Sequence, residues 1–463
     1  MERMEGVDAG YLYLETPTMH MHTLKVALID PPPHYSFQHL TAELVARLDR
    51  IPPFQRRALP VPLALNHPLW LADHDLDPAK HVLRHRLPEA AVMADLESLI
   101  GQIASIPLDR AAPLWEVHVC EGLADGRIAV VGKMHHALAD GAVANALLVN
   151  LTDESGGSSA DRALHSPEPT PSRPTQVRLA LRDAIAQLFT LPRLLWTTAR
   201  AVTQLVRQRR RSPDAVPRPV LDVPRVSFNA ALTARRSFAT ATLPLADIKE
   251  VRRRHGVTVN DVVLAVVAGA LRAWLDERGE RPARSLVAGV PVATDQPGAG
   301  RRLAGNRVSN LFTSLATDVD DPDERLHLIS RTTAASKEVQ RALGPQMLVD
   351  WVQFAPPAPL SAVMRLYSRA GLASRHAPPF NLVVSNVPGP REPVTIAGAQ
   401  LDDLFSVGPI LEGIGLNITA WSYVDRMNFS LLSCPDLVAD LGPLVARLGP
   451  ALDELLTLEA DAR

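Results

Sequence analysis

The sequence predicts an α/β protein with two halves that a long connector joins. Strand-like apolar runs alternate with helix-like segments along most of the 463 residues, which is typical of α/β proteins. Two proline-rich segments, 155–174 and 212–224, interrupt this alternation, and the length suggests more than one domain. We therefore place an N-terminal half at 1–155, a connector at 156–225 and a C-terminal half at 226–463.

In the N-terminal half, strand-like apolar runs alternate with segments of helical spacing. Apolar runs predict strands at 23–29, 115–119 and 126–134, and helical spacing predicts helices at 37–48, 91–106 and 142–151. The strand at 126–134 contains an unbroken apolar run from Ile128 to Val131, which indicates burial on both faces. Residues 135–141 therefore lie where a strand ends and a helix begins, a place where catalytic groups are often presented.

The connector carries a basic helical segment at 176–211. It has one acid, Asp183, many arginines, and large apolar residues such as Phe189 and Trp196. Pro192 should break or kink this segment into two helices. Basic amphipathic helices of this kind can lie in a membrane interface. They can equally be surface helices whose arginine stems cover apolar surface, so two interpretations are open.

The C-terminal half resumes the alternation. A strand is predicted at 236–243, a helix at 259–277 and a further strand at 380–384. Thr258 as N-cap and Asp261 at the third helical position fit a capping box, so Asp261 is expected to be structural. Asn260 lies between them and is open to a structural or a catalytic role.

Composition narrows the class of protein. The formal net charge of −2 gives no electrostatic reason to expect nucleic acid as a partner. The two cysteines, Cys120 and Cys434, cannot form a disulfide framework and favour a reducing cytoplasm. No signal-peptide pattern and no apolar run long enough to span a membrane is present in the sequence. We expect a cytoplasmic protein, and the membrane-interface interpretation of segment 176–211 would place it peripherally on the inner membrane face or on lipid droplets.

The most informative pattern is His-His-x-x-x-Asp-Gly, formed by His135, His136, Asp140 and Gly141. A histidine can hold or release a proton near neutral pH. A carboxylate four residues later can fix the ring or organise the turn that presents it, and the glycine permits a sharp backbone bend. The alternative is an ordinary turn in which Asp140 caps a helix. The complete pattern between a strand and a helix favours a catalytic site.

Five further blocks accompany this pattern in a fixed order. They are the opening stretch 8–22, Pro113-Leu114-Trp115, Asn260-Asp261, Gly305-Asn306-Arg307-Val308-Ser309 and Ser385-Asn386-Val387-Pro388-Gly389-Pro390. Together they resemble the bacterial wax ester synthase/acyl-CoA:diacylglycerol acyltransferase family, over nearly the whole chain. The resemblance implies two chloramphenicol-acetyltransferase-like subdomains, each a mixed sheet with flanking helices, joined by the helical and proline-rich linker.

The resemblance also assigns roles near the histidine pattern. It implies that His136 is the general base, with His135 as a neighbour that shapes the tunnel, binds substrate or merely packs. Asp140 resembles a structural acid that holds the turn through a buried arginine, for which Arg307 is our candidate because an unpaired buried carboxylate is costly. Arg301, Arg302 and Arg307 are also candidates to bind the phosphates of coenzyme A, and the sequence does not decide among them. Gly141 serves the backbone, and no covalent acyl-enzyme is required.

Other family blocks supply candidates of different kinds. Asn260 is a candidate donor to the oxyanion of the tetrahedral intermediate, and Ser385 and Asn386 are weaker candidates. Pro113, Leu114 and Trp115 cannot move protons; they form a wall of the acyl tunnel or pack in the core before a strand.

The implied reaction is transfer of a long-chain acyl group from acyl-CoA to diacylglycerol or a long-chain alcohol. Acyl-CoA enters as a co-substrate, and no cofactor is expected. No metal site is predicted, because His20 and His22 lack a third ligand at a suitable spacing. The alternatives are transfer to another hydroxyl or an amine, and a silent lipid-binding or lipid-droplet protein that keeps the fold.

Overall fold

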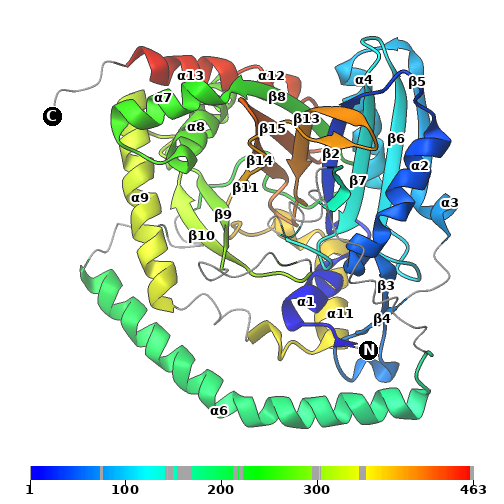
Figure 1. Ribbon diagram of the computed structural model, residues 1–463. Helices are drawn as coiled ribbons and strands as arrows, with labels where there is room; N and C mark the ends of the chain where they lie inside the picture. The colour runs from blue at the N-terminus through cyan, green and yellow to red at the C-terminus, as the bar shows by residue number, and fades with distance from the viewer. Residues whose placement is uncertain are drawn as a thin grey trace.

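The computed structural model describes residues 2–72, 77–140, 143, 150–153, 169–211, 217, 223–294, 302, 304–343 and 351–458. Two six-stranded sheets and one small three-stranded sheet form the framework (Figure 1). The N-terminal sheet has the spatial order β12 (Thr395–Ile396), β13 (Ala399–Val407), β2 (His22–Asp30), β7 (Ile128–His135), β6 (Trp115–Leu123) and β5 (Val82–Ala91). The C-terminal sheet has the order β10 (Val308–Ser314), β9 (Val287–Ala293), β11 (Leu382–Pro388), β14 (Leu416–Tyr423), β15 (Arg426–Ser433) and β8 (Ser237–Pro244).

Both large sheets are mixed. Strand β5 pairs parallel with β6, and β11 pairs parallel with both β9 and β14, whereas the other pairs of these sheets are antiparallel. The small sheet has the order β1 (Glu2–Arg3), β4 (Leu69–Ala72) and β3 (Arg56–Leu59). The predicted strands at 23–29, 115–119, 126–134, 236–243 and 380–384 fall on β2, β6, β7, β8 and β11.

Chain order does not divide the sheets cleanly. Strands β12 and β13, which follow the C-terminal strand β11, complete the N-terminal sheet. β13 pairs antiparallel with β2, with Leu404 opposite Ala27. A boundary at residue 226 therefore describes the sequence but not the sheets, since part of the predicted C-terminal half crosses over.

Helices pack around the sheets (Figure 1). They are α1 (Gly6–Leu14), α2 (Phe37–Ala46), α3 (Pro78–His81), α4 (Met93–Ser105), α6 (Arg173–Arg211), α7 (Leu245–His255), α8 (Val259–Glu277), α9 (Pro322–Leu343), α11 (Pro357–Arg369), α12 (Gly442–Val445) and α13 (Leu448–Thr457). Short 3-10 helices lie at η1 (Leu48–Arg50), η2 (Pro52–Gln55), η3 (Pro62–Ala64) and η5 (Leu372–Ser374).

Helix α8 is the centre of the C-terminal core. Its side chains from Val262 to Leu271 are buried almost without interruption, because α7, α9 and α13 enclose it against the sheet. The predicted capping box begins this helix: Thr258 Oγ1 accepts from the Asp261 backbone N–H, and Asp261 accepts from that of Thr258. Ser330 of α9 also donates to Asp261, so this carboxylate is structural.

Helix α6 contradicts the prediction of two helices. It runs as one helix with Pro192 inside, and Figure 1 shows it as a long bent arc along the edge of the molecule. Proline removes one backbone hydrogen bond, and an exposed helix can tolerate that loss by bending. The arc is fixed at several points, including Arg3 paired with Asp183 at 2.9 Å and Trp351 donating to Thr198 at 2.9 Å.

No single helix among the described residues is both long and apolar enough to cross a bilayer. The adjacent helices α7 and α8 are long and apolar enough only when taken together, and a bend of 106° separates them.

Candidate active site

The two histidines of the motif leave the end of β7 with their backbones held on both sides. The His135 N–H donates to the Leu114 carbonyl at 2.9 Å, and the His136 N–H donates to the Met21 carbonyl at 2.7 Å. Successive side chains at a strand end point to opposite faces. His135 is therefore fully buried, whereas His136 lines a cavity of about 170 Å³. Because His135 and His136 are consecutive, their side chains have different surroundings.

The ring of His136 is fixed by stacking and by one hydrogen bond. Tyr11 of α1 stacks on it with ring centroids 4.3 Å apart. Its Nδ1 lies 3.1 Å from Oδ1 of Asn306. Burial lowers the pKa of His136 to about 4, so the imidazole is neutral at physiological pH.

Asn306 decides which nitrogen of His136 carries the proton. Its Nδ2 donates to Asp8 at 2.7 Å and to the His136 carbonyl at 2.8 Å. The Asn306 oxygen must therefore accept, so His136 Nδ1 carries the hydrogen and Nε2 is left unprotonated. Burial raises the pKa of Asp8 to about 7. A line of three side chains, Asp8, Asn306 and His136, thus links the opening stretch of the chain to the histidine motif.

Asp140 clamps the motif to the C-terminal part of the chain. Its Oδ1 accepts from the Val143 backbone at 2.9 Å. Its Oδ2 accepts from the Arg302 side chain and from the Arg307 backbone N–H, each at 2.8 Å. The prediction that Arg307 supplies the cation was wrong, because its side chain is exposed and only its amide reaches the carboxylate. Gly141 lies outside the described residues.

His135 is held away from the cavity. Its Nδ1 accepts from the Ala137 backbone at 3.1 Å, and its Nε2 faces Glu15 at 3.6 Å. The ring is 0% exposed and forms an edge contact with His22. This position suits the structural alternative, in which His135 braces the turn that presents its neighbour.

Two other predicted residues lie in different places. Ser385 of β11 lines the cavity beside His136. Asn260 lies in the first turn of α8, next to the capping box, and is not among the residues that line this cavity. Asn260 therefore has no part in the lining of the His136 cavity, and the oxyanion role stays a prediction.

The three residues of the Pro-Leu-Trp block separate into two environments. Trp115 belongs to the core, where it stacks on Phe54 and donates to the Phe54 carbonyl at 2.8 Å. Pro113 is buried beside it. Leu114 lines a second cavity of about 290 Å³, with a mainly apolar wall that includes Leu12 and Tyr13. Only Leu114 thus has the position of a tunnel wall.

Lys25 is a residue of the cavity that sequence reasoning missed. It lies in β2, and its Nζ donates to Ser406 and stands 4.6 Å from the centre of the Trp421 ring. Burial lowers its pKa to about 7. A single lysine inside the otherwise apolar run 23–29 was the available signal, since lysine is rarely buried without a specific role.

Comparison with known proteins places these features in a family. Residues 4–263 match the model of the wax ester synthase/diacylglycerol acyltransferase catalytic domain, and residues 304–456 match that of the C-terminal domain of the same family. A putative diacylglycerol O-acyltransferase of Mycobacterium tuberculosis is 37% identical over 443 residues, covering 95% of this chain and 92% of the relative. Another from that organism is 34% identical over 477 residues, covering 100% and 91%.

Solved structures agree with the fold. A wax ester synthase/diacylglycerol acyltransferase from Marinobacter aquaeolei VT8 has a TM-score of 0.68 and 27% identity, covering 98% of each chain. The first condensation domain of the calcium-dependent antibiotic synthetase has a TM-score of 0.61 at 16% identity, covering 99% of this chain and 97% of that one. The second likeness concerns the fold alone. The predicted class, two mixed sheets with flanking helices, is confirmed.

Proposed function

The chain belongs to the wax ester synthase/diacylglycerol acyltransferase family, and we propose that His136 is the general base of its acyl transfer. It is an acyl-CoA-dependent O-acyltransferase that moves an acyl group from acyl-CoA to the hydroxyl of diacylglycerol. The observation that carries the assignment of His136 is its neutral ring, which lines a cavity with Nδ1 engaged and Nε2 unprotonated.

In the proposed reaction, one proton passes from the acceptor hydroxyl through His136 to the coenzyme A thiolate. Nε2 of His136 takes the proton of the acceptor hydroxyl as the hydroxyl oxygen attacks the thioester carbonyl carbon. The tetrahedral intermediate then collapses, the C–S bond breaks, and the protonated ring returns the proton to the coenzyme A thiolate. The ring ends neutral, and no acyl group is bonded to the protein.

Asn306 and Asp8 act as positioning residues in this proposal. The amide holds Nδ1–H and so prevents the ring from presenting its protonated nitrogen to the hydroxyl. The hydrogen bond to the Asn306 amide raises the His136 pKa, but burial outweighs it, and a neutral amide adds no charge attraction of the kind that a carboxylate in the same place would supply. The imidazole therefore remains a free base above a pH of about 4.

The two cavities suggest a division between reacting groups and hydrocarbon. Helix α1 contributes Tyr11 to the His136 cavity and its neighbours Leu12 and Tyr13 to the apolar one. We propose that the reacting ester and hydroxyl meet in the first cavity and that hydrocarbon occupies the second, beside Leu114. Exposed Arg307, next to the clamp on Asp140, is a candidate for the coenzyme A phosphates.

Exposed apolar side chains of α6, α11 and η3 form a candidate surface for lipid. The large ones are Leu63, Leu181, Ile185, Leu188, Phe189, Leu195, Trp196, Val363 and Leu366. Residues of α11, including Arg365, also line the apolar cavity. Arginines of α6 add positive charge, which favours anionic lipid. We propose a cytoplasmic enzyme that attaches peripherally to the inner membrane face or to lipid droplets.

Release of coenzyme A tests the general base. Wild type and His136→Ala are given palmitoyl-CoA with dioleoylglycerol, and in parallel with hexadecanol. Acceptor-dependent release should fall by roughly 10²- to 10⁴-fold in the variant. The exposed His39→Ala of α2 serves as a matched control and should retain wild-type release.

The two acceptors also separate the open alternatives. A preference for dioleoylglycerol or for hexadecanol ranks triacylglycerol against wax ester formation. Equal release by wild type and His136→Ala would overturn the assignment of the base. Absence of release with either acceptor would favour the lipid-binding alternative or another acceptor class.

Vesicle sedimentation tests the lipid surface. Phe189→Ser with Trp196→Ser should weaken binding to vesicles that contain phosphatidylglycerol, and vesicles of phosphatidylcholine alone should bind less of the wild type. Val92→Ser with Ile106→Ser removes exposed apolar side chains of similar exposure elsewhere and should leave binding unchanged. Equal loss in both double variants would contradict a specific surface.

A further inference from the structure

Three potential metal ligands meet on the outer helices of the C-terminal sheet. His255 is the last residue of α7, and Asp323 and His327 lie in the first turns of α9. Asp323 and His327 are four residues apart, so their side chains share one face of the helix. Gly256 follows His255 in a left-handed conformation, with φ of 64°, and ends α7 at the point where the ring faces α9.

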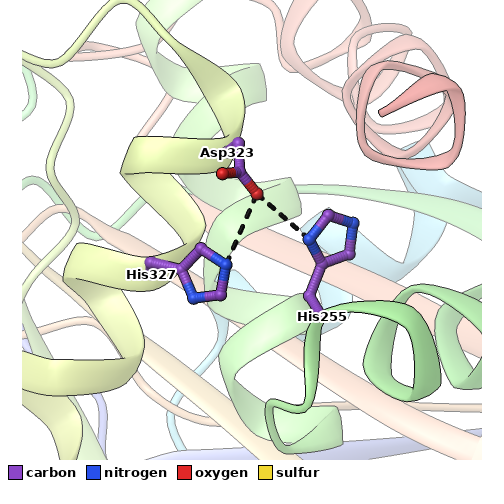
Figure 2. A group of neighbouring side chains, drawn as sticks. All are labelled: His255, Asp323 and His327. Carbon is purple, nitrogen blue, oxygen red and sulfur yellow. Dashed lines mark ion pairs between the residues drawn. The ribbon is translucent and has the colours of Figure 1, made fainter. Parts of the chain in front are cut away.

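The geometry points to a binding site for a late first-row divalent cation such as Zn²⁺, held by this group of His255, Asp323 and His327, the α7–α9 cluster. One ligand atom from each residue lies within 4.8 Å of the others. His255 Nδ1 is 3.0 Å, and His327 Nε2 is 3.5 Å, from the same Asp323 oxygen. Figure 2 shows both rings turning a nitrogen toward that oxygen.

These separations are close to those that coordination requires. Ligand atoms bonded to zinc at about 2.0–2.2 Å in a tetrahedral arrangement lie roughly 3.3 Å apart. The two nitrogens already lie near that distance from the Asp323 oxygen, so small side-chain rotations would suffice. Two imidazoles and one carboxylate are a ligand set that zinc accepts, with water completing the coordination.

Exposure and charge also suit a cation. The His255 side chain is only 3% exposed, whereas those of Asp323 and His327 are 37% and 40% exposed. An ion could therefore enter from solvent and contact one ligand that the core already holds. The neighbouring cations Arg253 and Arg254 are both paired with Glu250, which reduces their repulsion of an incoming ion.

The position indicates a structural ion, separate from the acyl transfer. No member of the α7–α9 cluster lines either of the two cavities described above. Both helices pack on α8, the buried helix of the C-terminal core. A bound ion would join the end of α7 to the start of α9, and so would stabilise the folded state by binding linkage.

Direct metal binding tests the inference without reference to catalysis. The full chain, stripped of metal with a chelator and desalted, is titrated with ZnCl₂ by isothermal calorimetry. One saturable site per chain is expected, and His327→Ala and Asp323→Asn should each weaken it by at least roughly tenfold. Both positions are partly exposed, so these variants should fold. His39→Ala, an exposed histidine outside the cluster, should bind as the wild type does.

Thermal denaturation supplies a second readout. Saturating Zn²⁺ should raise the Tm of wild type and of His39→Ala, and should raise that of His327→Ala much less. Two results would overturn the inference: no saturable zinc binding by the wild type, or equal affinity in wild type and His327→Ala. The latter would place any bound zinc elsewhere on the chain.

Discussion

Two of the regions that place histidine beside carboxylate, the His136 site and the α7–α9 cluster, differ in what separates the two groups. At His136 the amide of Asn306 lies between the ring and Asp8, and the histidine lines a cavity. In the α7–α9 cluster both rings face one carboxylate oxygen directly and the group opens to solvent. An indirect link orients a histidine while leaving its pKa low, whereas direct contact assembles ligands for a cation. A neutral group between histidine and carboxylate therefore suits a general base, and its absence suits a metal ligand.

The largest expected difference concerns stability at the clamp. Arg302→Ala leaves Asp140, whose side chain is 0% exposed, without its cation, and should lower the free energy of unfolding by about 3 kcal/mol. Arg307→Ala keeps the backbone hydrogen bond to Asp140. It should therefore change the free energy of unfolding by less than about 0.5 kcal/mol. Urea denaturation of both variants measures the contrast. Equal effects would mean that the clamp does not depend on the ion pair.

The next largest effect concerns the intervening amide. Asn306→Ala removes the acceptor of Nδ1–H and should lower kcat by roughly one order of magnitude or more. Asn306→Asp puts a carboxylate against the ring and should raise the His136 pKa from about 4. The acid limb of the kcat/KM profile should then move to higher pH. An unmoved limb together with lower kcat would indicate a merely structural role for Asn306.

A smaller effect is expected from Asp8. Its folded-state pKa of about 7 lies above the ordinary 3.8, so the folded state holds this proton more tightly. The stability that this group contributes is complete below a pH of about 4 and is lost as the pH rises through about 7. Asp8→Asn should therefore raise the Tm relative to wild type more at pH 8 than at pH 5, while lowering kcat only a few-fold. A constant Tm difference across this range would contradict the assigned ionisation.

The smallest effect should come from the solvent-open region. Without metal, His327→Ala should change the free energy of unfolding by less than about 0.5 kcal/mol, because its side chain is 40% exposed. Denaturant titration in the presence of a chelator measures this. A loss comparable to that of Arg302→Ala would show that the cluster is a structural network in its own right, and the contrast between the two regions would fail.

Local sequence patterns predicted much of the fold because strands and helix caps depend on residues that are close in sequence. The apolar runs located β2, β6, β7, β8 and β11, and Thr258 with Asp261 predicted the cap of α8. These features depend on neighbours within a few residues. The expected division into two helices at Pro192 was wrong, because an exposed helix can lose one backbone hydrogen bond and bend without ending.

The candidate site was predictable only in part. The spacing of the motif indicated His136, but no spacing could join Asp8 to Asn306, which are 298 positions apart. Spacing could not predict that Arg302, and not Arg307, pairs with Asp140. It could not predict the meeting of the three residues of the α7–α9 cluster either. Contacts of this kind depend on how the sheets pack, and pattern in one chain does not contain that information.

Strands β12 and β13 join the N-terminal sheet although they come late in the chain, and this has a consequence for synthesis. Strand β2 lies beside β13 in the folded protein, so its outer edge is unpaired until residue 407 leaves the ribosome. At roughly 5–20 residues per second, the delay after β7 lasts on the order of tens of seconds. An open, apolar strand edge is a template for aggregation during that time. Nascent chains halted before β12 should therefore depend on chaperones, and truncation there should not yield a soluble N-terminal half.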